Sequence, residues 1–139
     1  MTFEELQTLI TDPTKNQFAQ HNGIRVDEAD LTHSVVTCQV REESLNPYNI
    51  VHGGVYFSMM DVASGVLARM DGRLYVTLDS SNHFYRAATH GLLTATGELV
   101  RRGRTICTVN AQVRDEDGVL LSDGSYSMFC VEPDRSANG

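Results

Sequence analysis

One carboxylate, Asp61, stands alone in a long uncharged segment of the chain. Between Gly53 and Ala68 no other residue carries a charge. An isolated carboxylate among apolar neighbours is costly unless it has a partner or a task, and such a group can serve as a general base or nucleophile. The structural alternative is that a backbone amide or an arginine such as Arg86 satisfies it. The apolar surroundings favour a catalytic carboxylate in a cleft.

A second candidate group is the tripeptide His52-Gly53-Gly54, which directly precedes this segment. The first turn of a helix offers unpaired N–H groups at the positive end of the helix dipole. Glycines there let a substrate carbonyl approach the backbone closely. Together these features predict an oxyanion hole for acyl transfer. Taken alone, the tripeptide fits an ordinary loop-to-helix turn with a solvated or packed histidine equally well.

The spacing of these two groups bears on the assembly. His52 and Asp61 are nine residues apart, which corresponds to ~13 Å of rise along a helix. One carbonyl carbon therefore cannot touch both the amino-terminal amides and the carboxylate of the same helix. If both act on one bond, they come from two chains, and the active site lies at the interface of a twofold homodimer.

The element that must position both groups is a helix. Residues 55–70 have a helical pattern that is apolar or small on nearly all sides, which predicts a helix buried in the middle of the domain. Residues 1–20 are also expected to be helical, with an interruption at Asp12-Pro13. The last residues, 132–139, are expected to form a flexible tail.

The rest of the chain favours β-structure, because apolar and polar residues alternate and tight polar turns separate the segments. Good hairpin signals stand at 102–103 and 115–118. The fold class is therefore α+β: a single domain over residues 1–139 with one central helix and about five to six antiparallel strands. The regions that favour strands are 23–41, 73–86, 92–101, 104–114 and 119–131.

Composition limits the class of partner. The net charge is −7 over 139 residues, which opposes contact with a phosphate backbone, so no nucleic-acid partner is expected. No uncharged run approaches the ~20 residues that a bilayer span needs, and residues 1–17 hold no apolar core of signal-peptide length. No membrane partner and a cytoplasmic location are therefore expected. Cys38, Cys107 and Cys130 fit buried reduced thiols, and no histidine spacing indicates a metal site.

Several residues form a combination that is more specific than any of its parts: Asn46, His52-Gly53-Gly54, Asp61 and residues 83–88. This combination resembles the phenylacetic-acid-degradation (PaaI) branch of the hotdog-fold thioesterases, over nearly the whole domain. In that family a curved antiparallel sheet wraps a long central helix. Two subunits pair their sheets edge to edge, often as a dimer of dimers. The resemblance implies an acyl-CoA thioesterase that needs no cofactor, because the coenzyme A thioester is its substrate.

The resemblance also implies a role for each matching residue. Asp61 corresponds to the catalytic acid, which activates water or attacks the thioester directly. Gly53 corresponds to the residue whose N–H polarises the carbonyl, and His52 supports its loop. Asn46 is implied to hold the nucleophile or the thioester, and Thr77 to orient the water. Asp61 could thus act as a nucleophile or as a general base, and the assembly could be a homodimer or a homotetramer.

Coenzyme A carries phosphates at its nucleotide end and so needs cations. Arg101, Arg102 and Arg104 lie together at a predicted hairpin of an otherwise acidic chain, and guanidinium groups match phosphate oxygens well. On the residues alone, a solvated turn is an equal alternative. The family often places the nucleotide near this turn, so these arginines are expected to bind it, with Gly54 also contacting the substrate.

The acyl group is the least determined feature. Tyr56, Phe57 and two following methionines suggest an apolar pocket for an aryl or medium-chain acyl group, although a helix core uses the same residue types. Two positions depart from the family's pattern. Asn49 stands where many members have glycine, so the loop there could turn differently, and Ala88 replaces a common proline.

Two other functions stay open. A hydratase or dehydratase of acyl thioesters needs a histidine and an acid that converge on adjacent carbons, and the motifs for this are not evident. A non-catalytic acyl-CoA-binding protein would have little reason to keep a carboxylate in an apolar helix. Hydrolysis of an acyl-CoA to the free acid and coenzyme A is therefore the leading prediction.

Overall fold

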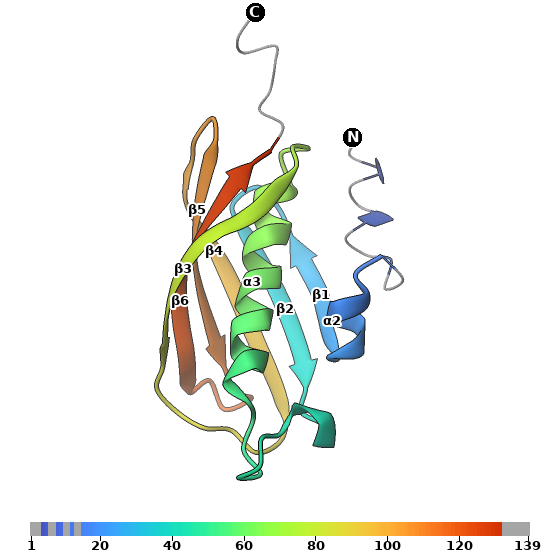
Figure 1. Cartoon of the computed structure of the whole chain (residues 1–139), viewed down its shortest axis with the longest axis vertical. Helices are drawn as coiled ribbons and strands as arrows, with labels where there is room; N and C mark the ends of the chain where they lie inside the picture. The colour runs from blue at the N-terminus through green and yellow to red at the C-terminus, as the bar shows by residue number, and fades with distance from the viewer. Residues whose placement is uncertain (1–3, 6–7, 10–11, 13–14, 132–139) are drawn as a thin grey trace, which may run out of the picture.

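A computed structural model of the chain describes residues 4–5, 8–9, 12 and 15–131. One long helix, α3 (Gly53–Arg69), lies against one face of a curved six-stranded antiparallel sheet (Figure 1). This arrangement confirms the predicted hotdog fold. Across the sheet the strand order is β1-β2-β4-β5-β6-β3. The strands are β1 (Ile24–Ala29), β2 (His33–Gln39), β3 (Tyr75–Phe84), β4 (Leu92–Arg102), β5 (Ile106–Arg114) and β6 (Leu120–Cys130).

The first predicted strand region is in fact a hairpin. Residues 23–41 form β1 and β2, which pair antiparallel. The turn between them is built by Asp30, whose Oδ1 accepts hydrogen bonds from the N–H groups of Thr32 and His33, each at 2.8 Å. No glycine or proline occurs between β1 and β2, so the sequence pattern alone did not reveal this turn.

Near the amino terminus, the described residues agree with helical structure in part. Residues 4–5 and 8–9 are helical and Asp12 is not. A separate short helix, α2 (Gln17–His21), follows beside β1 (Figure 1). The remaining positions of the predicted helix before residue 15, and the tail 132–139, lie outside the described residues. The short 3₁₀ turn η1 (Glu42–Ser44) follows β2 and leads toward α3.

α3 packs closely on the sheet because a glycine lies beneath it. At Gly97 of β4, a Cβ atom would lie 2.6 Å from Ser34 Oγ and 3.4 Å from the Ala63 carbonyl oxygen. The buried Ser34 hydroxyl donates to that carbonyl at 2.8 Å, which ties β2 to the middle of the helix. Asp61 precedes Ala63 by about half a helical turn, so this close approach also fixes the distance of Asp61 from the sheet.

The carboxyl end of α3 is held by a half-buried network of charges around Asp71. Arg102 donates to the last carbonyl groups of α3 and to Asp71 Oδ2 at 2.9 Å. Asp71 also accepts from Arg73 Nε and from the Tyr75 hydroxyl. Burial acts to raise the pKa of Asp71, but the hydrogen bonds from Tyr75 and Arg73 and the charge of Arg102 hold it below its usual value. The network anchors the helix to the β4–β5 turn.

The structure also bears on the predictions about the cysteines, a metal site and a membrane span. Cys38, Cys107 and Cys130 are free and buried. Within the described ranges, no group of three or more His, Cys, Asp or Glu side chains is placed to hold a metal ion. None of the helices in these ranges is long and apolar enough to cross a membrane.

Candidate active site

Asp61 lies on the side of α3 that faces Thr77 of the edge strand β3. It lines a pocket of about 390 Å³, whose wall also includes Thr77 of β3 and Phe18 of α2. Apolar side chains of α3 and β6 form much of the remaining wall. The helix is therefore not buried on every side as its composition predicted: Phe57 is 38% exposed on this face. In the single chain, Asp61 sits in an open cleft.

The carboxylate of Asp61 is oriented by Thr77. The Thr77 hydroxyl donates to Asp61 Oδ1 at 2.6 Å, across sixteen residues of sequence. In the described part of the chain, no hydrogen bond reaches the second oxygen, Oδ2. This oxygen is left free for a water molecule or for a thioester carbon. The structure thus brings together two of the residues that the sequence singled out.

Tyr126 of β6 supports the pocket, although the sequence did not point to it. Its side chain is fully buried, and its hydroxyl hydrogen-bonds to Asn82 Oδ1 at 2.6 Å. Its ring packs against Phe57 at 5.9 Å between centroids. Burial raises the pKa of Tyr126, and the charge of Asp61 raises it further, so the phenol stays protonated. Period-two alternation places Tyr126 on the inner face of β6, but its polar partners come from other elements.

A second residue missed from the sequence is Arg69, at the end of α3. It lines the same pocket as Asp61, and its Nη2 donates to the Tyr75 carbonyl at 3.1 Å. Burial lowers the pKa of the Arg69 guanidinium, and the charge of Asp61 acts in the opposite direction. Arg86, the arginine named as a structural partner for Asp61, is exposed and does not line this pocket.

The amino terminus of α3 forms a separate group. His52 caps the helix, because its Nδ1 accepts from the Gly54 N–H at 2.8 Å. The Gly53 N–H has no acceptor among the residues that the structure describes. The Phe84 ring packs against this glycine, since a Cβ atom on Gly53 would lie in van der Waals contact with it at 3.6 Å. The Gly54 amide is occupied, and the Gly53 amide is available.

The loop before the tripeptide is shaped by Asn46. Its Oδ1 accepts from the N–H groups of Tyr48 at 2.9 Å and Ile50 at 3.4 Å. Asn49 has a φ of 63°, the left-handed conformation that glycine adopts readily and that asparagine tolerates. The departure from glycine at this position therefore needs no different turn. Asn46 lies with the helix terminus, not in the Asp61 pocket.

The three arginines of the β4–β5 turn differ in what they contact. Arg102 donates to carbonyl groups of α3 and to Asp71, so its guanidinium is committed to the fold. Arg101 and Arg104 are exposed. None of the three lines the Asp61 pocket.

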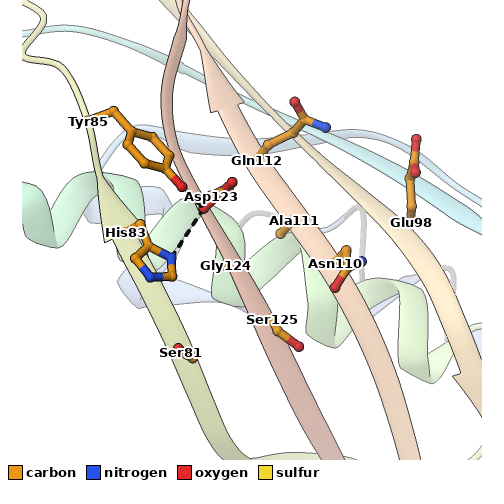
Figure 2. Close-up of a pocket in the computed structure, with 10 residues that line it drawn as sticks. All are labelled: Ser81, His83, Tyr85, Glu98, Asn110, Ala111, Gln112, Asp123, Gly124 and Ser125. Atoms are coloured by element: carbon orange, nitrogen blue, oxygen red, sulfur yellow. Dashed lines mark hydrogen bonds and ion pairs between the residues drawn. The ribbon is translucent and has the colours of Figure 1, made fainter.

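A second pocket lies on the opposite face of the sheet, with α3 behind it (Figure 2). It has a volume of about 470 Å³ and is lined by polar side chains of β3, β4, β5 and β6. Asp123 lies 3.5 Å from His83 Nδ1 and accepts from the Tyr85 hydroxyl at 2.8 Å. Asp61 and Thr77 do not line this pocket. The carboxylate that the sequence predicts to be catalytic therefore lies on the face of the sheet where α3 packs.

Comparison with known proteins agrees with this fold. The chain matches the family model of the thioesterase superfamily over residues 48–122. A protein of Deinococcus radiodurans that is assigned as an esterase is 34% identical over 114 residues, which cover 79% of this chain and 76% of that protein. The similarity to this relative therefore covers most of the domain.

Solved structures also share the fold of this chain. A hypothetical thioesterase of Streptococcus pneumoniae, crystallised with coenzyme A, is 29% identical with a TM-score of 0.79, covering 87% of this chain and 98% of that one. A Streptococcus mutans protein bound to acetyl-CoA is 28% identical with a TM-score of 0.75, covering 79% and 90%. A Haemophilus influenzae thioesterase, 21% identical over 95% and 92% of the two chains, shares the fold with a TM-score of 0.82. The chain belongs to the thioesterase superfamily and is a hotdog-fold thioester hydrolase.

Proposed function

We propose that this protein hydrolyses acyl-CoA thioesters, with Asp61 as general base or nucleophile and the N–H of Gly53 of the partner subunit as the oxyanion donor. The observation that carries the proposal is the pocket in which Thr77 orients the Asp61 carboxylate. A carboxylate with one oxygen held and the other free can take a proton from water or attack a thioester carbon. The developing oxyanion then needs an N–H donor within hydrogen-bond distance.

Two relatives support this choice of residues and substrate. In further structures of the Streptococcus pneumoniae thioesterase, an aspartate and a threonine sixteen positions apart have each been replaced by alanine. Asp61 and Thr77 have the same separation. The same protein was crystallised with coenzyme A, and the Streptococcus mutans relative with acetyl-CoA. These ligands favour a coenzyme A ester as the substrate of this chain.

The need for two subunits follows from the distance along α3. Gly53 and Asp61 are separated by eight residues of one continuous helix, or ~12 Å of axial rise. Neither Gly53 nor His52 lines the Asp61 pocket. A single chain therefore presents the base and the oxyanion donor at two different places, and a second copy must supply the missing half of each site.

The sheet offers an edge through which such a copy could bind. β3 is an edge strand of ten residues, and Val76 and Leu78 on it are 50% and 57% exposed. A long uncovered edge with apolar side chains pairs readily with another strand. Antiparallel pairing of two β3 strands about a twofold axis would cover these side chains and join the sheets. We propose this homodimer as the catalytic unit, with a dimer of dimers as a possible larger assembly.

For coenzyme A, we propose Arg101 and Arg104 as phosphate contacts, because both are exposed at the β4–β5 turn. Arg102 is a weaker candidate, since its guanidinium already donates to α3 and Asp71. For the acyl group, the apolar wall of the Asp61 pocket favours an aryl or aliphatic chain of moderate length.

The decisive experiment combines a panel of acyl-CoAs with variants of Asp61. Release of free coenzyme A is followed with a thiol reagent for the wild-type protein, Asp61→Asn and Asp61→Ala. We expect wild-type turnover of at least one ester, and a loss of kcat on the order of 10²-fold or more in both variants with the fold kept. Near-normal turnover in either variant would contradict the role of Asp61. Hydration of crotonyl-CoA without thiol release would instead identify a hydratase.

A further inference from the structure

Arg69 brings a positive charge into the pocket that holds Asp61. It is the last residue of α3, and its guanidinium folds back along the helix over Gly65. Nη1 lies 3.0 Å from the position that a Cβ atom of Gly65 would occupy, so the missing side chain makes room for the guanidinium. Gly65 is four residues after Asp61, which is ~6 Å of axial rise. The cation and the carboxylate thus line one cleft about one helical turn apart.

Arg69 has donors that the described part of the chain does not use. Its Nη2 donates to the Tyr75 carbonyl, but no carboxylate of the described residues lies within ion-pair distance of it. The other half-buried arginines near this end of the helix, Arg73 and Arg102, both pair with Asp71. A half-buried guanidinium stays charged, and it is costly to leave it without an anion. Arg69 therefore has the capacity to bind an anion that the chain itself does not supply.

The pocket around Arg69 defines the rest of the ligand. Phe18, Val62, Val66 and Met128 contribute apolar wall. A ligand that fits these surroundings has an apolar stretch beside Asp61 and a hydrogen-bond acceptor at its far end. A carboxylate is the best match, because it can accept two charge-assisted hydrogen bonds from one guanidinium.

We propose that the acyl group ends in a carboxylate bound by Arg69, so that the substrate is a short dicarboxylic acyl-CoA. This inference rests on the proposed thioesterase function and on its site. The separation of about one helical turn between Asp61 and the guanidinium suits an acyl chain of about four to six carbons. In this arrangement Arg69 selects the substrate and does not touch the reacting thioester.

The test compares adipoyl-CoA with hexanoyl-CoA, which have the same number of carbons and differ in the terminal carboxylate. We expect the wild-type protein to favour adipoyl-CoA in kcat/KM by about tenfold or more. Arg69→Met should abolish this preference, mainly through KM for adipoyl-CoA, while hydrolysis of hexanoyl-CoA is kept. Arg69→Lys should retain part of the preference. Arg25→Met, which removes an exposed arginine of β1 outside the pocket, should leave both rates unchanged.

Two results would overturn the inference. One is a wild-type protein that hydrolyses hexanoyl-CoA as well as or better than adipoyl-CoA, a measurement that needs no variant to fold. The other is an equal loss of both activities in Arg69→Met, which would assign Arg69 to coenzyme A binding or to the fold. If hexanoyl-CoA is cleaved in an Asp61-dependent way without preference for adipoyl-CoA, only this inference fails. If neither ester nor any other acyl-CoA is cleaved, the proposed function fails with it.

Discussion

Thr77 acts on the proposed chemistry through the carboxylate that it holds. Its hydroxyl donates to Asp61 Oδ1 at 2.6 Å, which restrains the carboxylate in the cleft that Asp61 lines. A short hydrogen bond to a charged acceptor is among the stronger interactions that a neutral side chain can make. Thr77 lies on the edge strand β3, so the strand that we propose as the dimer interface also orients the base.

We predict different effects for two replacements of Thr77. Thr77→Val keeps the β-branched shape and removes the hydroxyl, and it should lower kcat by about tenfold or more through loss of one charge-assisted hydrogen bond. Thr77→Ser keeps the donor and should stay within about threefold of the wild-type value. Steady-state hydrolysis of the best acyl-CoA measures both. Equal activity of the valine and serine variants would show that the hydroxyl has no part in turnover.

The Gly53 amide can be tested without disturbing the helix. Gly53 is the first residue of α3, where proline is tolerated, and His52 before it has φ −62° and ψ 136°, which a following proline accepts. Gly53→Pro removes the N–H, whereas Gly53→Ala keeps it. We expect a loss of about 10²- to 10³-fold in kcat for the proline variant, and a much smaller loss for alanine. Comparable losses in both would indicate a steric effect instead of a lost donor.

At the scale of elements, the two ends of α3 differ in how they are bonded to the rest of the chain. The carboxyl end is tied down by Arg102, Arg73 and Asp71, and the middle is tied to β2 through Ser34. The amino end is capped by His52 yet keeps the Gly53 N–H unpaired within the described residues. The anchored end and middle therefore hold Asp61 at a fixed height, and the free amide is left available for a ligand.

The Asp71 network predicts how stability depends on pH. Because the folded state lowers the pKa of Asp71 from 3.8, the folded protein binds fewer protons there than the unfolded chain near and below that pH. The stabilisation from Asp71 is thus present above pH 3.8 and is lost as the pH falls through the lower, folded value.

Asp71→Asn should lower the free energy of unfolding by about 2 kcal/mol at neutral pH, since hydrogen bonds from charged donors are weakened. Urea denaturation of both proteins at several pH values measures the difference. We expect it to shrink at acid pH, below about pH 3.8, as the wild-type carboxyl takes up its proton. A difference that is constant over the whole range would mean that the charge of Asp71 does not stabilise the fold.

At the scale of the whole molecule, the proposal requires that each site draw on two chains. The variants Asp61→Asn and Gly53→Pro each damage a different half of the site. In a mixed dimer, one site contains both substitutions. The other site combines the intact Asp61 of one chain with the intact Gly53 of the other. Neither variant alone contains such an intact site.

We therefore predict that the two inactive variants restore activity when they are mixed. After subunit exchange at equal concentration, about half of the dimers are mixed and one of their two sites is intact, which gives about a quarter of wild-type activity. Sedimentation of the mixture should show dimers or larger assemblies. Absence of recovery despite demonstrated exchange would place the base and the donor of each site in the same chain.

The sequence alone was sufficient for the helix and most of the strands. Charge, periodicity and turn residues are local signals, and they predicted α3, β4, β5 and β6 to within a few residues. They missed the turn at Asp30 between β1 and β2, which no glycine or proline marks in the sequence. The isolation of Asp61 and the tripeptide before it are also visible in one dimension, which is why both groups could be proposed without coordinates.

Only the tertiary structure decided which groups meet. The bond from Thr77 to Asp61 depends on how β3 crosses the helix, and the commitment of Arg102 to α3 depends on where the β4–β5 turn ends. Arg69 and Tyr126 carried no sequence signal, because their significance comes from elements distant along the chain. Local patterns reflect the period of one element, whereas the pocket is made by three-dimensional contacts among α2, α3, β3 and β6. The sequence thus determined the fold class and the candidate carboxylate, and packing determined what surrounds it.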